Sequence, residues 1–348
     1  MQKILDKVAK DLKSITTRES NRVVFSNPEY SSVDFSGENF HEIPKNIDSD
    51  GHKIVYIDGG NTTLVESASF IASFVRLCAC VYQGNKRLMM QKHEFFVVVS
   101  SANEDGKIKY TTNIYPMNDA SIPSVSDLKF DSMDETLRDG VSRAEIGKVV
   151  DCCRRFAELN LAAKVAYDLD EKDIIILDGT LEAKYTNENK YLNMLYKVAL
   201  SKDLKLCALS KTCRWVTDSG DNALIALGRM TKLPAWYYFP IAKVNSSKHQ
   251  AHLFVVKLHE KSDYLFRFEL HNGVELDGIA LRDLFFQISQ HAKDPVYLGY
   301  PYGLIEADRH GRVSNNEKNY LQTILASKIK LDNYSRSMDA HSVLDNIG

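Results

Sequence analysis

The sequence predicts an α/β protein with a mixed central sheet, and two patterns along the chain support this. Near the N-terminal third, β-rich segments separated by short turns are typical of an antiparallel meander: 53–57, 64–82 and 94–100. The middle of the chain then reads helix, strand, helix, strand, which favours parallel strands. The strands of this middle part are expected at 174–177 and 204–209. From about residue 234, aromatic β segments follow at 236–239, 253–256 and 264–268.

Helices are expected where apolar residues recur at a period near 3.6. The N-terminal one, 1–17, is amphipathic, and its apolar residues are Ile4, Leu5, Val8, Leu12 and Ile15. The others are expected at 142–167, 188–201, 279–292 and 314–330. Ser142 with Glu145, and Ser314 with Glu317, fit capping boxes at two of these helix starts.

The domain prediction follows from these patterns. Residues 1–50 form an N-terminal extension of one helix and a polar, loop-like stretch, 51–330 form the main domain, and 331–348 form a polar tail. The segment 116–140 is also expected to be a loop, because it is rich in Pro, Asp and Ser.

Composition limits the class of protein. Of 348 residues, 44% are hydrophobic and 26% are charged, and the formal net charge is only −2. These values exclude a disordered or strongly basic chain and argue against non-specific coating of DNA. The longest apolar run, near 64–81, is interrupted by Glu66 and Arg76, so no membrane span is expected.

The six cysteines indicate the compartment. None forms a CxxC pair, and all lie in apolar or helical surroundings: Cys78, Cys80, Cys152, Cys153, Cys207 and Cys213. We interpret them as reduced, buried thiols of a cytoplasmic protein, with a metal–thiolate site as the alternative. The N-terminus carries no signal peptide pattern.

Two aspartates follow unusually apolar strands. Asp58 comes after Ile54–Ile57 and precedes two glycines, which would allow the chain to turn sharply, and Asp178 comes after Ile174–Leu177 and precedes Gly179. If both strands belong to one sheet, the two carboxylates meet at its edge, where they repel each other unless a cation or a proton lies between them. A divalent metal ion is the simplest solution, and an ordinary Asp-Gly turn after each strand is the alternative.

Further polar residues are candidates for the same site. Glu158 on the predicted helix can return towards Asp178, although Arg154 and Arg155 are ready partners for it. Lys211, at the end of a strand, could hold a phosphate or could simply be exposed. In the segment 299–310, Glu306, Asp308 and His310 are possible metal ligands, or ordinary charges at a helix start.

Taken in order, these motifs resemble the NurA nuclease family. They are an Asp-Gly-Gly after the first strand, Arg-x-x-Glu on a helix, Asp-Gly-Thr-Leu, Ser-Lys-Thr and Tyr-Pro-x-x-Leu-x-x-Ala-Asp, from about residue 53 to 325. The resemblance implies an RNase H-like core, a homodimer, and a manganese-dependent nuclease for single- and double-stranded DNA. It also implies a HerA-type hexameric ATPase as the partner in DNA end resection.

By motif, the resemblance identifies Asp58, Glu158 and Asp178 as metal-binding acids and Tyr300 as the active-site tyrosine. Eight residues after that tyrosine, archaeal members carry a histidine, whereas this chain carries Asp308, with His310 two residues later. Either an all-oxygen metal site or a displaced His310 would account for the difference.

The resulting hypothesis is a 5′–3′ exonuclease and endonuclease with two Mn²⁺ or Mg²⁺ ions about 4 Å apart. Asp58 would bridge the ions, Glu158, Asp178 and Asp308 would complete their shells, and Lys211 would steady the phosphate. Tyr300 and the aromatic residues 236–238 could stack on unpaired bases, or the latter could form a buried sheet or dimer surface. The biological role would be DNA end processing or defence against phage.

Two other functions remain open at this point. Asp58–Thr62 and Asp178–Thr180 also resemble the phosphate loops of the actin and sugar-kinase superfamily, which would imply an ATP phosphotransferase. A non-catalytic DNA-binding subunit of an ATPase complex is the other alternative.

Overall fold

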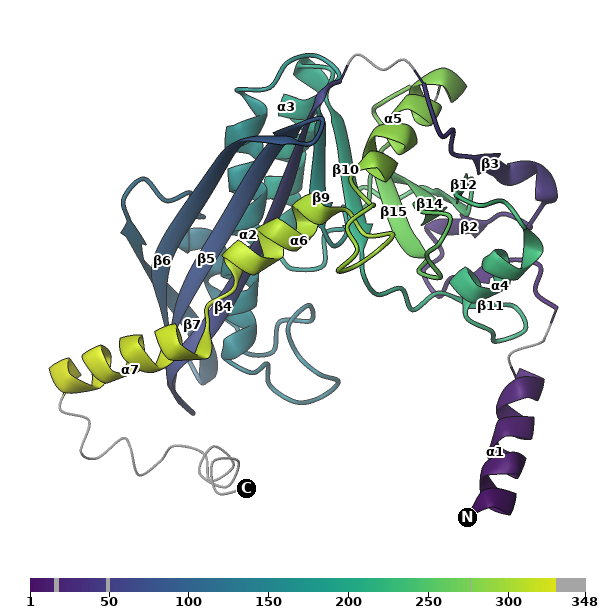
Figure 1. Ribbon diagram of the computed structural model, residues 1–348. Helices are drawn as coiled ribbons and strands as arrows, with labels where there is room; N and C mark the ends of the chain where they lie inside the picture. Colours follow the sequence, from purple (N-terminus) through teal and green to yellow (C-terminus); the bar gives the residue numbers. More distant parts are fainter. Residues whose placement is uncertain (16–18, 48–50, 276, 330–348) are drawn as a thin grey trace.

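The computed structural model describes residues 1–15, 19–47, 51–275 and 277–329, and an 11-stranded mixed sheet dominates it (Figure 1). In spatial order the strands are β3 (Phe40–Glu42), β12 (Trp236–Tyr238), β14 (Ala251–Lys257), β15 (Phe266–His271), β10 (Lys205–Ser210), β9 (Ile174–Asp178), β4 (Lys53–Ser67), β5 (Phe70–Gln83), β6 (Lys86–Glu104), β7 (Lys107–Met117) and β8 (Phe130–Asp131). The predicted α/β class with a mixed central sheet is confirmed.

The strand directions divide this sheet into three parts. From β4 to β7 the pairing is antiparallel, as the predicted meander requires, whereas β9 pairs in parallel with both β4 and β10. The order β6-β5-β4-β9-β10, with three antiparallel strands followed by two parallel ones, is that of an RNase H-like core. The aromatic strands β15, β14 and β12 then extend the sheet antiparallel beyond β10.

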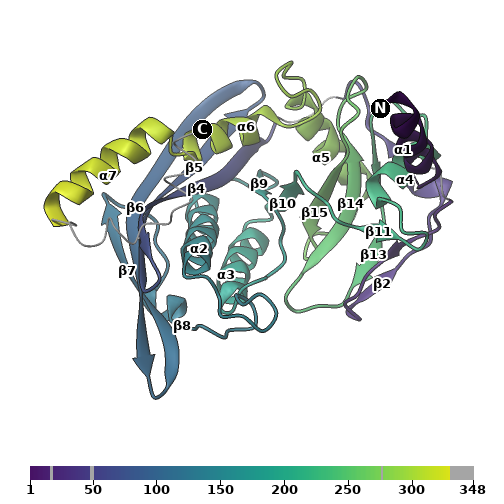
Figure 2. The same cartoon turned by 90° about the horizontal axis from the view of Figure 1, so that it is seen from below.

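Helices cover both faces of the core (Figure 2). α2 (Gly147–Ala166) and α3 (Glu188–Ser201) lie on one face, and α5 (Gly278–Gln290) and α6 (Tyr302–Gly311) lie on the other. Side chains alternate along a strand, so Ile174 and Ile176 pack towards α5 and α6 while Ile175 and Leu177 pack towards α2 and α3. This two-sided burial explains why β9 is a continuous apolar run.

The remaining elements lie around this core. They are α4 (Ala223–Met230), α7 (Asn315–Ile329), α1 (Gln2–Ile15), the short strands β1 (Val23–Val24), β2 (Tyr30–Ser32), β11 (Val216–Thr217) and β13 (Ala242–Val244), and two short 3₁₀ helices, Gly37–Asn39 and Val125–Leu128. Within the described residues 19–47, the polar stretch that was expected to be loop-like is therefore not simply a loop. Its short strands β1, β2 and β3 pair with the distant strands β11, β13 and β12.

Two predicted boundaries are wrong for a common reason. β4 continues through Asp58, Gly59 and Gly60 to Ser67, because β5 supplies pairing partners along this whole length. The glycines therefore do not form a turn, and the segment predicted at 64–82 is the end of β4 followed by β5.

The start of α2 also differs from the prediction. The helix begins at Gly147 with Ile146 as its N-cap, so Ser142 and Glu145 do not form the expected capping box. Instead, the backbone of Ala144 bonds to the Ser132 carbonyl at 2.7 Å and to the Tyr110 hydroxyl at 2.6 Å. At α7 the prediction is better, because the Glu317 amide donates to Ser314 Oγ at 3.2 Å.

The thiols and the N-terminal helix complete the description. All six cysteines are free, and five of them are buried.

The amphipathic α1 forms as predicted, but its apolar residues Ile4, Leu5, Val8 and Leu12 are 47–67% exposed. In the part of the chain that the structure describes, no helix combines the length and apolar character of a membrane span.

Candidate metal centre

Three carboxylates from distant parts of the chain meet at one place. They belong to Asp58 on β4, Asp178 at the end of β9 and Asp308 on α6, and one oxygen of each lies within 4.8 Å of the others. Among the described residues, this is the one group of three or more potential metal-binding side chains that converge in this way. All three are only partly buried, so the group is accessible from solvent.

The sheet itself brings the first two together. β4 and β9 are parallel neighbours, and Ile57 pairs with Leu177, so Asp58 and Asp178 follow next to each other in register. By the alternation of side chains, both point to the face that carries Tyr56, Ile176 and α6. The two apolar strands thus place the aspartates as the sequence suggests, although Asp58 lies within a strand rather than at its tip.

The third carboxylate depends on how closely α6 approaches β4 (Figure 1). A side chain at Gly303 would overlap the ring of Tyr56, which is fully buried. At the other end of the helix, a Cβ on Gly60 would lie 2.8 Å from the Gly311 carbonyl oxygen. Glycine at these positions therefore allows the contact that carries Asp308 to the two strand aspartates.

The carboxylates raise one another's affinity for a positive charge. Burial raises the pKa of Asp58 to about 8, together with repulsion from Asp178 and Glu158. The Lys211 ammonium lies 2.6 Å from Asp178 Oδ2 and 3.4 Å from Asp308 Oδ1. Burial alone would lower the pKa of Lys211, but these carboxylates raise it above its usual value, so the lysine is a fixed cation in the centre.

Glu158 approaches from the opposite face of the sheet. It lies on α2, and a Cβ on Gly59 would be only 2.8 Å from its Oε1, so the missing side chain makes room for it. Its carboxylate is bound by Arg154, and Arg155 lies 3.8 Å away. Burial raises the pKa of Glu158 and the arginines oppose this shift. Among the described residues, Glu158 is not part of the converging group.

Tyr300 lies beside the centre but has no access to solvent. Its side chain is fully buried, and its hydroxyl lacks a hydrogen-bond partner among the residues described. Burial raises the pKa of Tyr300, and the charges of Asp178, Asp58 and Asp308 raise it further. Tyr300 therefore cannot stack on a base in this structure, and that prediction is wrong.

Other candidates from the sequence lie elsewhere. Glu306 pairs with Arg87 and accepts from the Tyr82 hydroxyl at 3.3 Å. His310, two residues from Asp308 on α6, lies near Lys92, and burial with this charge lowers its pKa. Neither belongs to the converging group of the described residues.

Two sequence interpretations are corrected by the fold. Trp236, Tyr237 and Tyr238 are at most 3% exposed, so they form a buried sheet and cannot stack on DNA. The kinase-like interpretation needs a loop after Asp58, but Asp58–Thr62 is paired strand backbone throughout.

The residues of the centre fit a hard divalent cation. The donor set consists of carboxylate oxygens, which suit Mg²⁺ and Mn²⁺. The raised pKa of Asp58 and the orphaned hydroxyl of Tyr300 both indicate a place where a cation with bound water would satisfy groups that the protein leaves unsatisfied.

A second ionic cluster, which sequence reasoning missed, supports the segment after Asp178. Glu269 on β15 is fully buried and accepts from the Leu181 amide at 2.6 Å, from Arg267 Nε at 2.6 Å, and lies 3.0 Å from His249 Nε2. Nδ1 of His249 lies 2.7 Å from the Tyr30 hydroxyl on β2. Only the alternation of Arg267 and Glu269 on one strand face could have suggested part of this cluster from the sequence.

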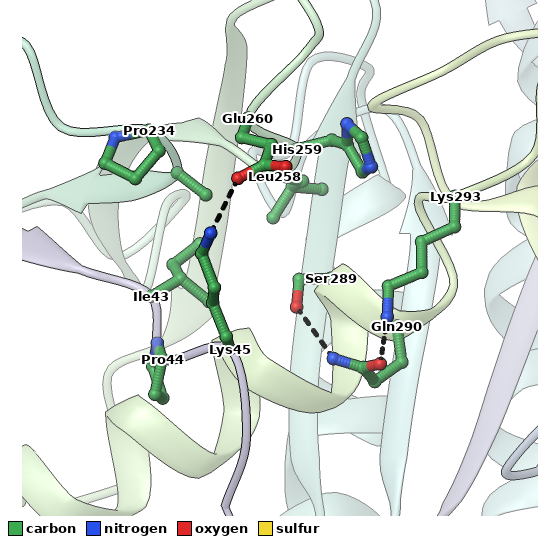
Figure 3. A pocket seen from close by; sticks show the side chains of 11 residues that line it. Ile43, Pro44, Lys45, Pro234, Leu258, His259, Glu260, Ser289, Gln290 and Lys293 are labelled. Atoms are coloured by element: carbon green, nitrogen blue, oxygen red, sulfur yellow. Dashed lines mark hydrogen bonds and ion pairs between the residues drawn. The ribbon is translucent and has the colours of Figure 1, made fainter.

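A separate pocket lies between α5 and the segments near 44, 235 and 259 (Figure 3). Its volume is about 190 Å³, and its charged groups are already paired, with Lys45 Nζ 2.9 Å from Glu260 and Lys293 Nζ 2.5 Å from Gln290. None of the site residues expected from the sequence lines it.

The chain is similar in sequence to one protein family and in structure to several solved proteins. The family model described as NurA domain matches residues 52–313. Among solved structures, the catalytic domain of human Endonuclease V is similar at 11% identity, covering 94% of this chain and 99% of that one, with a TM-score of 0.35. Endonuclease V of Ciona intestinalis has 12% identity, covers 93% and 100%, and has a TM-score of 0.35. The Argonaute of A. aeolicus has 10% identity, covers 76% and 29%, and has a TM-score of 0.34. No curated protein matches the chain.

Proposed function

This chain belongs to the NurA family of nucleases, and on that premise we propose that it hydrolyses DNA phosphodiester bonds with the help of divalent metal ions. The observation that carries the proposal is the convergence of Asp58, Asp178 and Asp308 within 4.8 Å. Repulsion between such close carboxylates destabilises the fold, so the cluster is not explained by stability. A metal-dependent phosphodiesterase, in contrast, needs clustered carboxylates to bind its ions.

Each side chain then has a definite task. Asp58, Asp178 and Asp308 would hold Mn²⁺ or Mg²⁺, which when bound supplies a Lewis acid and a water of lowered pKa. Lys211 would place its ammonium against a non-bridging oxygen of the scissile phosphate, where negative charge develops. The buried Tyr300 hydroxyl would donate to an oxygen in the centre, because in the described part of the chain it has no other acceptor.

The two-ion mechanism expected from the sequence requires a change in the contacts of Glu158. It uses Glu158 as a fourth carboxylate, and Glu158 would have to exchange Arg154 for a metal ion. The chemistry of hydrolysis itself, with an activated water and a stabilised phosphate, requires at least one ion.

Family membership also supports finer proposals about substrate and partner. We propose that the protein acts on single- and double-stranded DNA as a 5′–3′ exonuclease and an endonuclease. It would work as a homodimer with a HerA-type hexameric ATPase, in DNA end processing or anti-phage defence. A cytoplasmic location is consistent with a DNA substrate and with six free thiols.

The activity test compares the wild-type protein with Asp58→Asn on DNA labelled at the 5′ or the 3′ end. We expect cleavage with Mn²⁺ or Mg²⁺, none with EDTA, and none by the variant. Asp34→Asn, which changes an aspartate whose side chain is 77% exposed, is the matched control and should cleave normally. Closed circular DNA tests the endonuclease activity. Undiminished cleavage by Asp58→Asn would reject the centre as the active site.

The partner test uses the exposed apolar residues of α1. If this helix docks the ATPase, removal of residues 1–17 should abolish co-purification with a HerA-type ATPase while leaving cleavage of DNA intact. Unchanged co-purification would exclude α1 as the docking element.

A further inference from the structure

We propose that Lys211 takes the place of a second divalent ion, so that the centre binds one Mg²⁺ or Mn²⁺ together with a protein ammonium group. The proposal rests on the proposed function and specifies how its metal centre is built. It follows from three observations: where the lysine lies, how the charges balance, and why a fourth carboxylate is withheld.

The position of the ammonium is the first observation. Lys211 Nζ bridges Asp178 at 2.6 Å and Asp308 at 3.4 Å, two of the three carboxylates in the converging group. It lies 5.5 Å from the ring centre of Tyr300, which limits it on one side. A cation that bridges two carboxylates in this way occupies the space in which a second metal ion would share the same oxygens.

The charges are the second observation. Three carboxylates and one ammonium leave a net charge of −2, which one divalent cation neutralises. Two such ions would leave the same group at +2. Arg312 lies outside this sum because its side chain is 75% exposed and screened by water, but its guanidinium, 3.0 Å from Asp308 Oδ2, makes a second divalent ion still less favourable. Repulsion between two close divalent ions is acceptable only where more negative charge surrounds them.

The fourth carboxylate is the third observation. Glu158 is close enough to repel Asp58 electrostatically, but it is bound by Arg154 and flanked by Arg155. Only 6% of its side chain is exposed, so its negative charge is compensated inside the protein. Freeing it for a second ion would leave Arg154 without its partner in a largely buried place.

The proposal assigns distinct tasks to the two positive charges. The metal ion would bind at the Asp58 side, where no ammonium contacts the carboxylate among the described residues, and would activate the water. Lys211 would neutralise the opposite side of the phosphate. Unlike a second metal ion, its ammonium is part of the chain and does not have to bind from solution. A fixed ammonium also makes cleavage depend on the first power of the ion concentration.

Metal stoichiometry tests the proposal without reference to activity. Mn²⁺ would be titrated into the wild-type protein, Lys211→Met and Lys211→Arg by calorimetry, and the loaded proteins compared by electron paramagnetic resonance. We expect one ion and an uncoupled Mn²⁺ spectrum for the wild type and for Lys211→Arg, which keeps the charge. Lys211→Met should take up a second ion and show a spin-coupled pair.

A matched control separates this effect from a general loss of positive charge. Lys92 lies on the same sheet face, since Asp58 pairs with Cys78 and Cys78 with Lys92, but in the described structure it has no ion pair with the three aspartates. Lys92→Met should therefore still bind one ion. Melting temperatures of all variants confirm that they are folded.

The possible outcomes are distinct. Two ions in the wild-type protein, or one ion in both the wild type and Lys211→Met, would overturn the proposal. Two ions accompanied by metal-dependent cleavage would overturn only this inference and leave the nuclease function standing. No Mn²⁺ binding together with no cleavage would overturn both.

Discussion

Two carboxylates of the same sheet, Asp58 and Glu269, lie in opposite electrostatic environments. Asp58 on β4 lies among other acids, and burial and this repulsion raise its pKa to about 8. Glu269 on β15 is more deeply buried, which alone would raise its pKa, yet Arg267 and His249 lower it to about 2. Burial raises the pKa of both groups, and the sign of the neighbouring charges decides whether this shift is reinforced, as at Asp58, or reversed, as at Glu269.

The difference indicates that one cluster stabilises the fold, whereas the other leaves negative charge that a bound cation would neutralise. Glu269 has its charge and hydrogen bonds satisfied internally by Arg267, His249 and the Leu181 amide, so it stabilises the fold. Asp58 and its neighbours leave negative charge unsatisfied, at a cost in stability that a bound cation or a proton removes. The two clusters are connected, because Leu181 follows three residues after Asp178.

The largest effect is expected from a substitution that removes one carboxylate of the acidic cluster. Asp178→Asn removes a metal ligand and should lower the rate of DNA cleavage by at least ~10³-fold, about 4 kcal/mol of transition-state stabilisation. Single-turnover cleavage of labelled DNA measures it, with the melting temperature as the control for folding. A loss of less than tenfold would contradict the assignment of Asp178.

The next largest effect is expected from a substitution in the cluster around Glu269. Glu269→Gln leaves Arg267 and His249 without a buried counter-charge and should cost about 3 kcal/mol of the free energy of unfolding. Denaturant unfolding measures this loss. Glu182→Gln is the control, because Glu182 lies 3.9 Å from Arg267 and is one-third exposed, so its loss should matter far less. Equal losses for the two variants would refute the role of Glu269.

Metal addition should affect the two clusters differently. An ion that binds only the folded protein stabilises it by about 2.7 kcal/mol at 100 times its Kd. We expect this gain from Mn²⁺ in the wild type and in Glu269→Gln, but not in Asp58→Asn. Thermal melting with and without the ion gives the result. A gain that survives Asp58→Asn would show that the ion binds elsewhere.

A further effect, modest for each pH unit, appears in the pH dependence of the metal-free protein. Between the unfolded pKa of Asp58, roughly 4, and its folded pKa of about 8, the folded state holds the extra proton. Stability should therefore fall as pH rises through this window, by at most about 1.4 kcal/mol per pH unit for this proton. The contribution of Glu269 has the opposite sign and is lost only as pH falls towards about 2.

Denaturant unfolding in EDTA between pH 5 and pH 8 measures the first slope. Asp58→Asn should flatten it, whereas Glu269→Gln should lower stability by a similar amount at both ends. A slope unchanged by Asp58→Asn would show that another group is responsible.

The smallest effect concerns His310, which the sequence left as a possible ligand. Because it lies outside the converging group of the described residues, His310→Ala should change the cleavage rate no more than about twofold. Asp308→Asn in the same assay should resemble Asp178→Asn. The reverse ranking would mean that the histidine completes the centre.

The sequence predicts the parts of this centre that depend on local pattern. Continuous apolar runs predict that Asp58 and Asp178 follow strands, and the helical pattern places Glu158 on α2. The site roles of these residues remain predictions that the experiments above test.

Other parts depend on contacts that no local pattern contains. A helix start in 299–310 is only an alternative in the sequence, because two glycines weaken the helix signal of α6, and the position of α6 comes from the contact of Gly303 with Tyr56. The capping box at Ser142 fails because the Ala144 amide bonds to Ser132 instead. Strands β1 to β3 form by pairing with strands about 200 residues away.

The late position of α6 has a consequence for synthesis of the protein. A ribosome that has released the chain only as far as β15 has exposed Asp58, Asp178 and Lys211, but the helix that supplies Asp308 has not yet emerged. Lys211 would then neutralise half of the charge of the two strand aspartates, through its contact with Asp178. On the proposed function, the growing polypeptide would cut no nucleic acid until α6 has emerged and packed against the sheet.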